Sequence, residues 1–188
     1  DFTDFAQQLR QQCAPTVTDL SAQELTAWHP PAAPPAAVQL GSYAVALPAR
    51  PDSDDHAGPS IELPALLAFP HDGSLLLRAS GRGLDAAVQV LQNATLRLLS
   101  SFPAGKVRLT IIDPLGLGQN FSAFMHLADY DDRLVSGRIW TEAPHIHQRL
   151  MDLTEHMENV IQKYLRNEFH SIQEYNLRAG EVAEPFRI

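Results

Sequence analysis

The chain has 188 residues, of which 45% are hydrophobic and 19% charged, a balance typical of a globular protein rather than a disordered one. Its formal net charge of -8 argues against a broad DNA-gripping surface, because nucleic-acid binders are usually basic, although net charge does not exclude a local basic patch. The sequence has no apolar run close to the roughly 18 residues that a membrane-spanning helix requires.

Cys13 is the single cysteine, so the chain forms neither an internal disulfide nor a cysteine metal cluster. We therefore expect a reducing, cytoplasmic compartment and a small apolar role for Cys13 on a helix. The chain starts D-F-T-D, without an initiator Met or a signal peptide, and ends E-P-F-R-I, which is typical of a strand beginning. We expect it to be a piece of a longer protein.

Two domains are predicted. Residues 4–13 carry apolar side chains every four positions, which indicates a helix. Four prolines in residues 29–37 favour an extended linker. We therefore assign residues 1–37 to a helical arm and Pro-rich linker, and residues 38–188 to an α/β domain.

The α/β domain is predicted to begin with irregular β structure. Residues 38–47 indicate a strand or hairpin, and residues 50–60 a polar loop. Residues 61–69 are apolar, but Pro64 restricts them to an edge strand or an irregular segment. A turn is expected at residues 71–73.

A βαβ unit is predicted next. Residues 74–79 and 107–112 are short apolar runs, typical of strands buried on both faces. Between them lie a glycine loop at residues 80–83 and a helical pattern over residues 84–100. We therefore expect two parallel strands with a right-handed connection, in a mainly parallel sheet flanked by helices.

The last third of the chain is predicted to be mostly helical. Apolar residues at spacings of three and four indicate a long helix over residues 145–166, with Pro144 in its first turn. A shorter helix is expected over residues 171–178, ended by Gly180. Before them, residues 114–136 are expected to be rich in loops, with a short strand at 138–141.

The loop after the first predicted strand lies where phosphate binds in many nucleotide-binding proteins. A helix N-terminus offers free N–H groups and a partial positive charge. A functional phosphate loop also needs a small residue to open it, a Lys for the β- and γ-phosphates and a Ser or Thr for Mg²⁺. Residues 78–85 read R-A-S-G-R-G-L-D at this place.

Four separate landmarks give the chain a resemblance to DNA translocases of the FtsK/SpoIIIE class. Residues 79–83 (A-S-G-R-G) stand at the loop, and residues 107–114 (V-R-L-T-I-I-D-P) match a strand ending I-D-P. Residues 154–159 (T-E-H-M-E-N), with Tyr164 beyond, are similar to the E-M-E-x-x-Y stretch. Residues 171–176 (S-I-Q-E-Y-N) resemble the segment N-x-x-x-Y-N. The resemblance implies a P-loop NTPase fold, ATP and Mg²⁺ as cofactors of the family, and bacterial chromosome segregation and cell division.

The departures from the family pattern fall on the residues that would handle phosphate. The family's first Gly corresponds to Arg78, its Lys to Leu84 and its Ser to Asp85. Losing these contacts removes transition-state stabilisation, so we expect neither catalytic residues nor a bound cofactor here. In the family, a strand ending in a D-E pair follows, and the chain ends about where that strand would begin. The degenerate phosphate loop comprises Ser80, Gly81, Arg82, Gly83, Leu84 and Asp85.

Three functions remain open. The first is a catalytically silent module of a larger motor, with a structural or regulatory role, whose partners are other modules or subunits and which meets DNA only through the parent assembly. The second is a stand-alone protein–protein interaction domain that keeps only the α/β architecture. The third is an active NTPase that uses Arg82 and Asp85 in altered roles.

Other chemistry-bearing residues have simpler interpretations. Asp113 precedes Pro114 and is interpreted as a loop-capping residue rather than a metal ligand. His145 and His147 are two positions apart, so they point to different faces of a helix, and His156 is too distant to complete a zinc site.

The acidic and glycine-rich segments before the long helix are likewise interpreted as ordinary loops. Asp129, Asp131 and Asp132 lack the spacing of a calcium loop and indicate a solvated acidic loop. Gly116 and Gly118 lack a dinucleotide fingerprint and indicate a turn that opens no clear helix.

Overall fold

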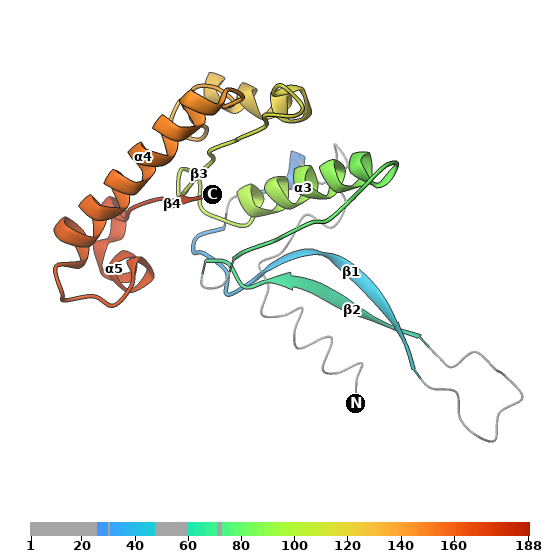
Figure 1. The fold of residues 1–188 in the computed structure, drawn as a ribbon. Helices are drawn as coiled ribbons and strands as arrows, with labels where there is room; N and C mark the ends of the chain where they lie inside the picture. Colours follow the sequence, from blue (N-terminus) through green and yellow to red (C-terminus); the bar gives the residue numbers. More distant parts are fainter. Residues whose placement is uncertain (1–25, 30, 48–59, 71–72) are drawn as a thin grey trace, which may run out of the picture. The chain divides into compact units, whose positions relative to one another are not determined.

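The structure, a computed structural model, describes residues 26–29, 31–47, 60–70 and 73–188. The expected helix at 4–13 with Cys13, and the loop at 50–59, lie outside these residues. The chain divides into two compact units, Asp1–Pro103 and Ala104–Ile188, which are described in turn (Figure 1). The predicted boundary at residue 37 falls within the first unit and stays a prediction.

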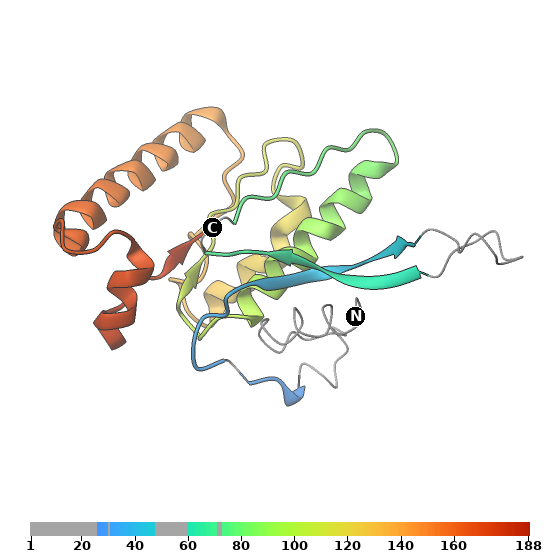
Figure 2. The ribbon, with the colours of Figure 1, turned by 90° about the horizontal axis from the view of Figure 1, so that it is seen from below.

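The first unit contains an antiparallel pair of strands, β1 (Val38–Ala46) and β2 (Ser60–Leu67). They pair from Val38 opposite Leu67 to Ala46 opposite Ser60, with a bulge between Gln39 and Gly41, and Figure 2 shows their twist. The predicted strand at 38–47 is confirmed. Segment 61–69 forms a regular strand for most of its length, because a two-stranded sheet leaves an open edge on each strand that tolerates proline.

Helix α3 (Gly83–Ser100) packs against β1. Hydrogen bonds join it to β1 and to the segment that precedes β1. Arg97 Nη1 donates to the carbonyl of Gln39 (3.4 Å), and the indole of Trp28 donates to the carbonyl of Ser100 (3.2 Å). Phe102 follows the helix, is buried, and meets Phe69 edge to face at 5.3 Å. The predicted helix at 84–100 is confirmed. Among the described residues of this unit, the buried apolar side chains are Val38, Leu67, Phe69, Ala94, Leu98 and Phe102.

The predicted buried strand at 74–79 is wrong. These residues have no regular secondary structure and are largely exposed, with Leu76 at 83%. A strand buried on both faces needs partner strands, and in the described residues β1 and β2 pair only with each other. The apolar run therefore stays extended without a ladder, and the expected βαβ unit does not form.

The second unit is built around parallel pairing. Strand β3 (Val107–Arg108) pairs in parallel with β4 (Phe186–Arg187). Beyond β3, Leu109 and Ile112 form isolated parallel bridges to Val135 and Trp140. The predicted strand at 107–112 is thus present in shortened form, and the one at 138–141 is reduced to the bridge at Trp140. The chain is a mixed α/β protein with helices and small sheets, one of them a parallel pair.

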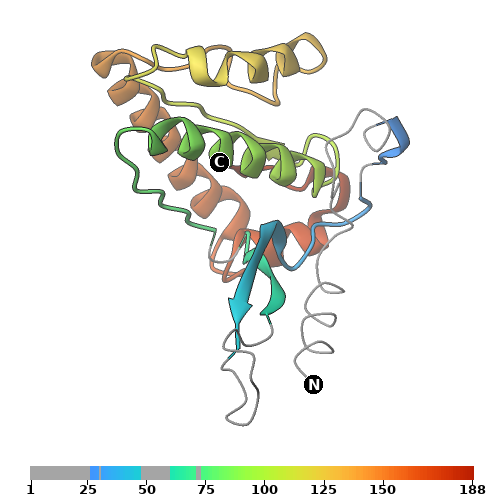
Figure 3. The same ribbon diagram turned by 90° about the vertical axis from the view of Figure 1, so that its right-hand side faces the viewer.

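Helices fill the rest of the second unit (Figure 3). The predicted turn at Gly116 and Gly118 is confirmed. A 3-10 helix, Gln119–Asp129, starts directly after Gly118, so the expectation that this turn opens no clear helix is wrong. Helix α4 (Ala143–Val160) continues into a π-helical turn (Ile161–Leu165), and α5 (Ile172–Ala179) leads into a 3-10 turn (Gly180–Val182). The long helix with Pro144 in its first turn is confirmed, as is the short helix ended by Gly180. In the described ranges, no helix has the length and apolarity needed to cross a bilayer.

Candidate functional site

The predicted phosphate loop is a tight turn at the start of α3. The amide of Gly83 donates to the carbonyl of Ser80 (3.1 Å), and the amide of Leu84 donates to the carbonyl of Gly81 (3.2 Å). Gly81 has a φ of 54°, a left-handed conformation that favours glycine. Two of the amides that a phosphate loop would offer are therefore engaged by the turn itself.

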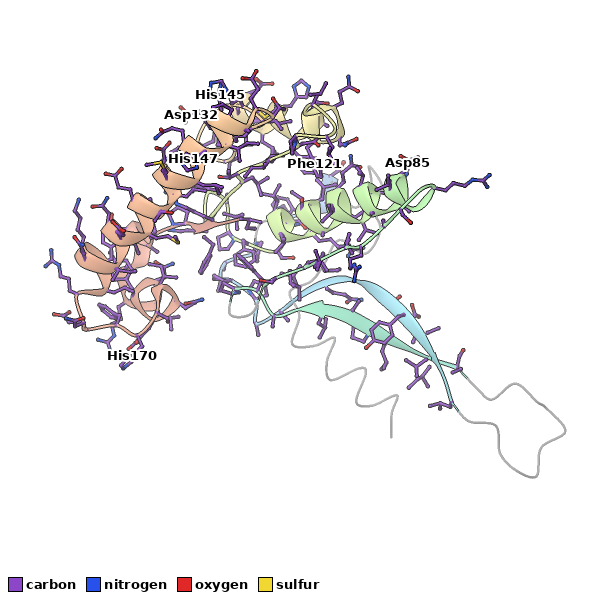
Figure 4. The ribbon with its side chains drawn as sticks, viewed as in Figure 1. Asp85, Phe121, Asp132, His145, His147 and His170 are labelled. Atoms are coloured by element: carbon purple, nitrogen blue, oxygen red, sulfur yellow. The ribbon has the colours of Figure 1, made fainter. Side chains whose placement is uncertain are left out.

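The charges at this turn do not converge on an anion. Asp85 lies in the first turn of α3, where its carboxylate is placed favourably against the positive end of the helix dipole (Figure 4). Arg82, the N-cap residue, makes no side-chain capping bond. Both side chains are exposed, and so is Leu84. The negative charge that a phosphate would bring is thus already supplied by Asp85.

The landmarks on α4 and α5 meet through their aromatic residues. Tyr164, in the π-helical turn, stacks on Tyr175 of α5 with ring centroids 5.3 Å apart. Phe169 meets Tyr175 edge to face at 5.5 Å, and the guanidinium of Arg178 lies over Phe169 at 5.3 Å. The segments around Tyr164 and Tyr175, 11 residues apart in sequence, therefore form one small cluster that holds α5 against the end of α4.

Asn176 fixes the segment before β4. Its Nδ2 donates to the carbonyl of Glu184, and its Oδ1 accepts from the amide of Glu184, both at 2.8 Å. The carboxylate of Glu184 in turn contacts His156 Nε2 (2.9 Å) and Arg187 Nη2 (3.3 Å). Side chains from α4 and β4 thus converge on the largely buried carboxylate of Glu184, while a side chain of α5 holds its backbone.

Two further arginines lie near Arg187, the arginine that pairs with this carboxylate. Arg108 of β3 is the direct register partner of Arg187 in β4, so the two side chains leave the same face of the pair. Arg149 of α4 donates to Thr110 Oγ1 (3.2 Å), two residues beyond Arg108 on the same face. Burial lowers the pKa of the Arg187 guanidinium, Glu184 opposes that shift, and the charges of Arg108 and Arg149 add to it. Arg108 and Arg149 therefore lie within electrostatic range of Arg187.

Sequence reasoning missed this arginine cluster, which we define as Arg108, Arg149 and Arg187. A signal was present in the alternation of residues 107–110: Val107 and Leu109 are buried, while Arg108 and Thr110 lie on the other face. The overall apolarity of the segment, by contrast, indicates burial on both faces, and this expectation is wrong for the face of Arg108 and Thr110. Arg149 and Arg187 carried no such signal, since tertiary structure alone brings them to this face.

The remaining predicted residues have local partners. Asp113 accepts a hydrogen bond from the amide of Gly116 at 2.8 Å, which confirms its capping role. Asp131 forms two side-chain hydrogen bonds with Arg133, which lower its pKa from 3.8 to about 2. His145, near the start of α4 in Figure 4, pairs with Glu142 (3.3 Å). The described part of the chain has no group of three or more His, Cys, Asp or Glu residues that could hold a metal ion.

Comparisons with known proteins add no family to this picture. No protein-family model matches the chain, and searches of curated proteins and of solved structures find no match.

Proposed function

We propose that the chain is a catalytically silent module of an FtsK/SpoIIIE-like motor, with a structural or regulatory role in a larger assembly. One observation carries the proposal: at the start of α3, the positions for the phosphate-binding Lys and the Mg²⁺-binding hydroxyl hold Leu84 and Asp85. A carboxylate at this point repels phosphate and satisfies the helix dipole by itself. The turn keeps the outline of a phosphate loop without its chemistry.

The hydrogen bonding around segment 107–112 supports a parallel α/β core for the proposed module. The backbone amide of Thr110 donates to the carbonyl of Ile188 (2.7 Å) on one side of the segment. The backbone amide of Leu109 donates to the carbonyl of Leu134 (2.8 Å) on the other side. The segment thus has parallel neighbours at both edges, as a central strand of a P-loop fold does. Under the proposal, its partners are other modules or subunits of the motor, and DNA is reached through them.

Restoring the loop tests the proposed ancestry. We expect the variant Arg78→Gly/Leu84→Lys/Asp85→Ser to bind ATP·Mg²⁺ in calorimetric titration at least tenfold more tightly than the parent chain, because it regains the lysine and hydroxyl contacts. Leu96→Lys, which adds the same charge at another exposed position of α3, is the matched control and is expected to match the parent. Equal ATP affinity of the parent, the triple variant and the control would refute the interpretation of this turn as a degenerate phosphate loop.

A turnover assay tests catalytic silence. Release of phosphate from ATP·Mg²⁺ by the parent chain is expected to equal that of the buffer. Turnover that disappears in the variant Arg82→Ala/Asp85→Ala would instead establish the active NTPase with altered residue roles.

A stand-alone interaction domain is the second candidate, favoured by apolar side chains at the surface of α4. Leu150, Met151 and Met157 are each about half exposed, at 48%, 53% and 56%. Clustered exposed apolar residues often mark a binding surface. The encoding gene distinguishes the two functions: an intact G-x-x-G-x-G-K-S module in the same gene supports the motor, and a separate gene supports the interaction domain.

A further inference from the structure

The arginine cluster has more positive charge than the described residues around it neutralise. Glu184 is the only carboxylate in the described chain that forms an ion pair with any of the three guanidinium groups, and it contacts Arg187. Among the described residues, Arg108 and Arg149 form no ion pair. Three like charges therefore lie close together, and one opposite charge pairs with Arg187.

A second carboxylate, Asp131, lies within electrostatic range of Arg108 but is already engaged. The charge of Arg108 contributes to the lowered pKa of Asp131, which places the two within electrostatic range. Both oxygens of Asp131, however, accept hydrogen bonds from the side chain of Arg133, each at 2.9 Å. Asp131 therefore does not neutralise Arg108 by direct pairing.

Part of the hydrogen-bonding capacity of the cluster is also unused. The Nε atoms of Arg108, Arg149 and Arg187 are each buried, and none has a hydrogen-bond partner among the described residues. Buried donors without acceptors, and like charges directly opposite each other on paired strands, are both unfavourable for folding. Such an arrangement is typical of sites that a negatively charged ligand completes.

We propose that Arg108, Arg149 and Arg187 form a binding site for a phosphoryl group, on the polar face of the β3–β4 pair and beneath α4. A tetrahedral dianion offers acceptor oxygens in several directions, so it can serve three guanidinium groups at once. A carboxylate has two oxygens in one plane and serves one guanidinium in bidentate fashion. Three arginines against one glutamate also match the charge of a phosphate dianion.

The supporting residues fit such a site. Thr110 positions Arg149 through its hydroxyl at 3.2 Å, and Trp140 lies under the guanidinium of Arg149, 5.8 Å from its ring centroid. Glu184 orients Arg187 while Asn176 holds the backbone of Glu184. All of these residues belong to the second unit, so the site does not depend on the turn at residues 80–85 or on the proposed motor function.

Calorimetric titration of the full chain with inorganic phosphate at constant ionic strength tests the proposal. We expect saturable binding of one phosphate per chain, weakened at least tenfold in both Arg108→Gln and Arg149→Gln. Arg166→Gln, an exposed arginine outside the cluster, is the matched control and is expected to stay within twofold of the parent. Loss of binding in Arg166→Gln as well, or no saturable binding in the parent, would overturn the site.

Two further titrations define the ligand. Acetate is expected to bind at least tenfold more weakly than phosphate, and equal affinity would overturn the phosphoryl preference. ATP binding more tightly than phosphate, and weakened by Arg149→Gln, would assign the phosphoryl group to a nucleotide, whereas affinity no greater than that of phosphate would assign it to free phosphate. A circular dichroism melt of each variant shows whether it is folded. If Arg108→Gln does not fold, Arg149→Gln, whose substitution lies on a helix, carries the test by itself.

Discussion

Arg108 and Arg187 are direct partners across the parallel β3–β4 pair, so two guanidinium groups leave the sheet side by side. Like charges in this position destabilise a strand pair. Without a bound anion, we expect Arg108→Gln to raise the free energy of unfolding by roughly 0.5 kcal/mol, because it removes this repulsion. Urea denaturation in phosphate-free buffer at low salt measures the change. A loss of stability would show that packing of the arginine stem outweighs the charge.

Salt provides an independent check of the same repulsion. Raising sodium chloride from about 0.01 M to about 0.1 M shortens the Debye length from about 30 Å to about 10 Å. We therefore expect the parent chain to gain more stability from added salt than Arg108→Gln does. Parallel salt responses of the two proteins would argue against repulsion between Arg108 and Arg187.

Asn176 is expected to be important for stability. Asn176→Ala removes both hydrogen bonds to the backbone of Glu184 and leaves its amide and carbonyl without these partners, so we expect a loss of about 1–3 kcal/mol. Asn159→Ala, which removes one exposed bond to the helix backbone, is the control and should cost less than about 0.5 kcal/mol. Chemical denaturation of both variants measures the difference, and equal losses would contradict the role assigned to Asn176.

Gly116 lies against the carboxylate of Asp113, and a side chain at this position has no room. A Cβ atom there would come within 2.8 Å of both Asp113 carboxylate oxygens and would also meet the amide of Asn120. We expect Gly116→Ala to destabilise the chain by about 1–3 kcal/mol through overpacking. Gly137→Ala is the matched control, because a Cβ at Gly137 meets nothing within 4 Å. Thermal denaturation compares them, and an unchanged midpoint for Gly116→Ala would contradict the close approach.

Asp131 is expected to titrate in strong acid. Its hydrogen bonds with Arg133 lower its pKa from 3.8 to about 2. A lowered carboxyl pKa stabilises the fold above the unfolded value, and this contribution is lost as the pH falls from 3.8 through about 2. Carboxyl-detected NMR should give this midpoint in the parent and a higher one in Arg133→Gln. Identical midpoints would exclude Arg133 as the cause.

The parts of the fold that the sequence predicts well are those with local signals. Helices α3, α4 and α5 follow from apolar spacing, Pro144 and Gly180, all of which act within a few turns of chain. Segment 74–79 is the counterexample. Its apolar run is typical of a buried strand, but strand formation depends on neighbours, which apolarity alone does not supply.

The candidate site was accessible from the sequence only in part. The turn at residues 80–85 could be located because a glycine pair precedes a helix, and the loss of lysine could be seen directly. The arginine cluster could not be located from the sequence, because Arg108 and Arg187 are 79 positions apart and meet only through strand pairing. The π-helical turn at Ile161–Leu165 also escapes simple periodicity, since it inserts an extra residue and changes the direction in which Tyr164 points.

The two-way bond between Asn176 and Glu184 has a consequence for how this end of the protein opens. The amides of Glu184, Phe186 and Ile188 donate in turn to Asn176 of α5, Lys106 and Arg108. Detaching the last residues therefore requires α5 to release them at the same time. We expect these three amides to exchange with deuterated solvent at closely similar free energies of opening, as a single foldon, rather than to open one after another.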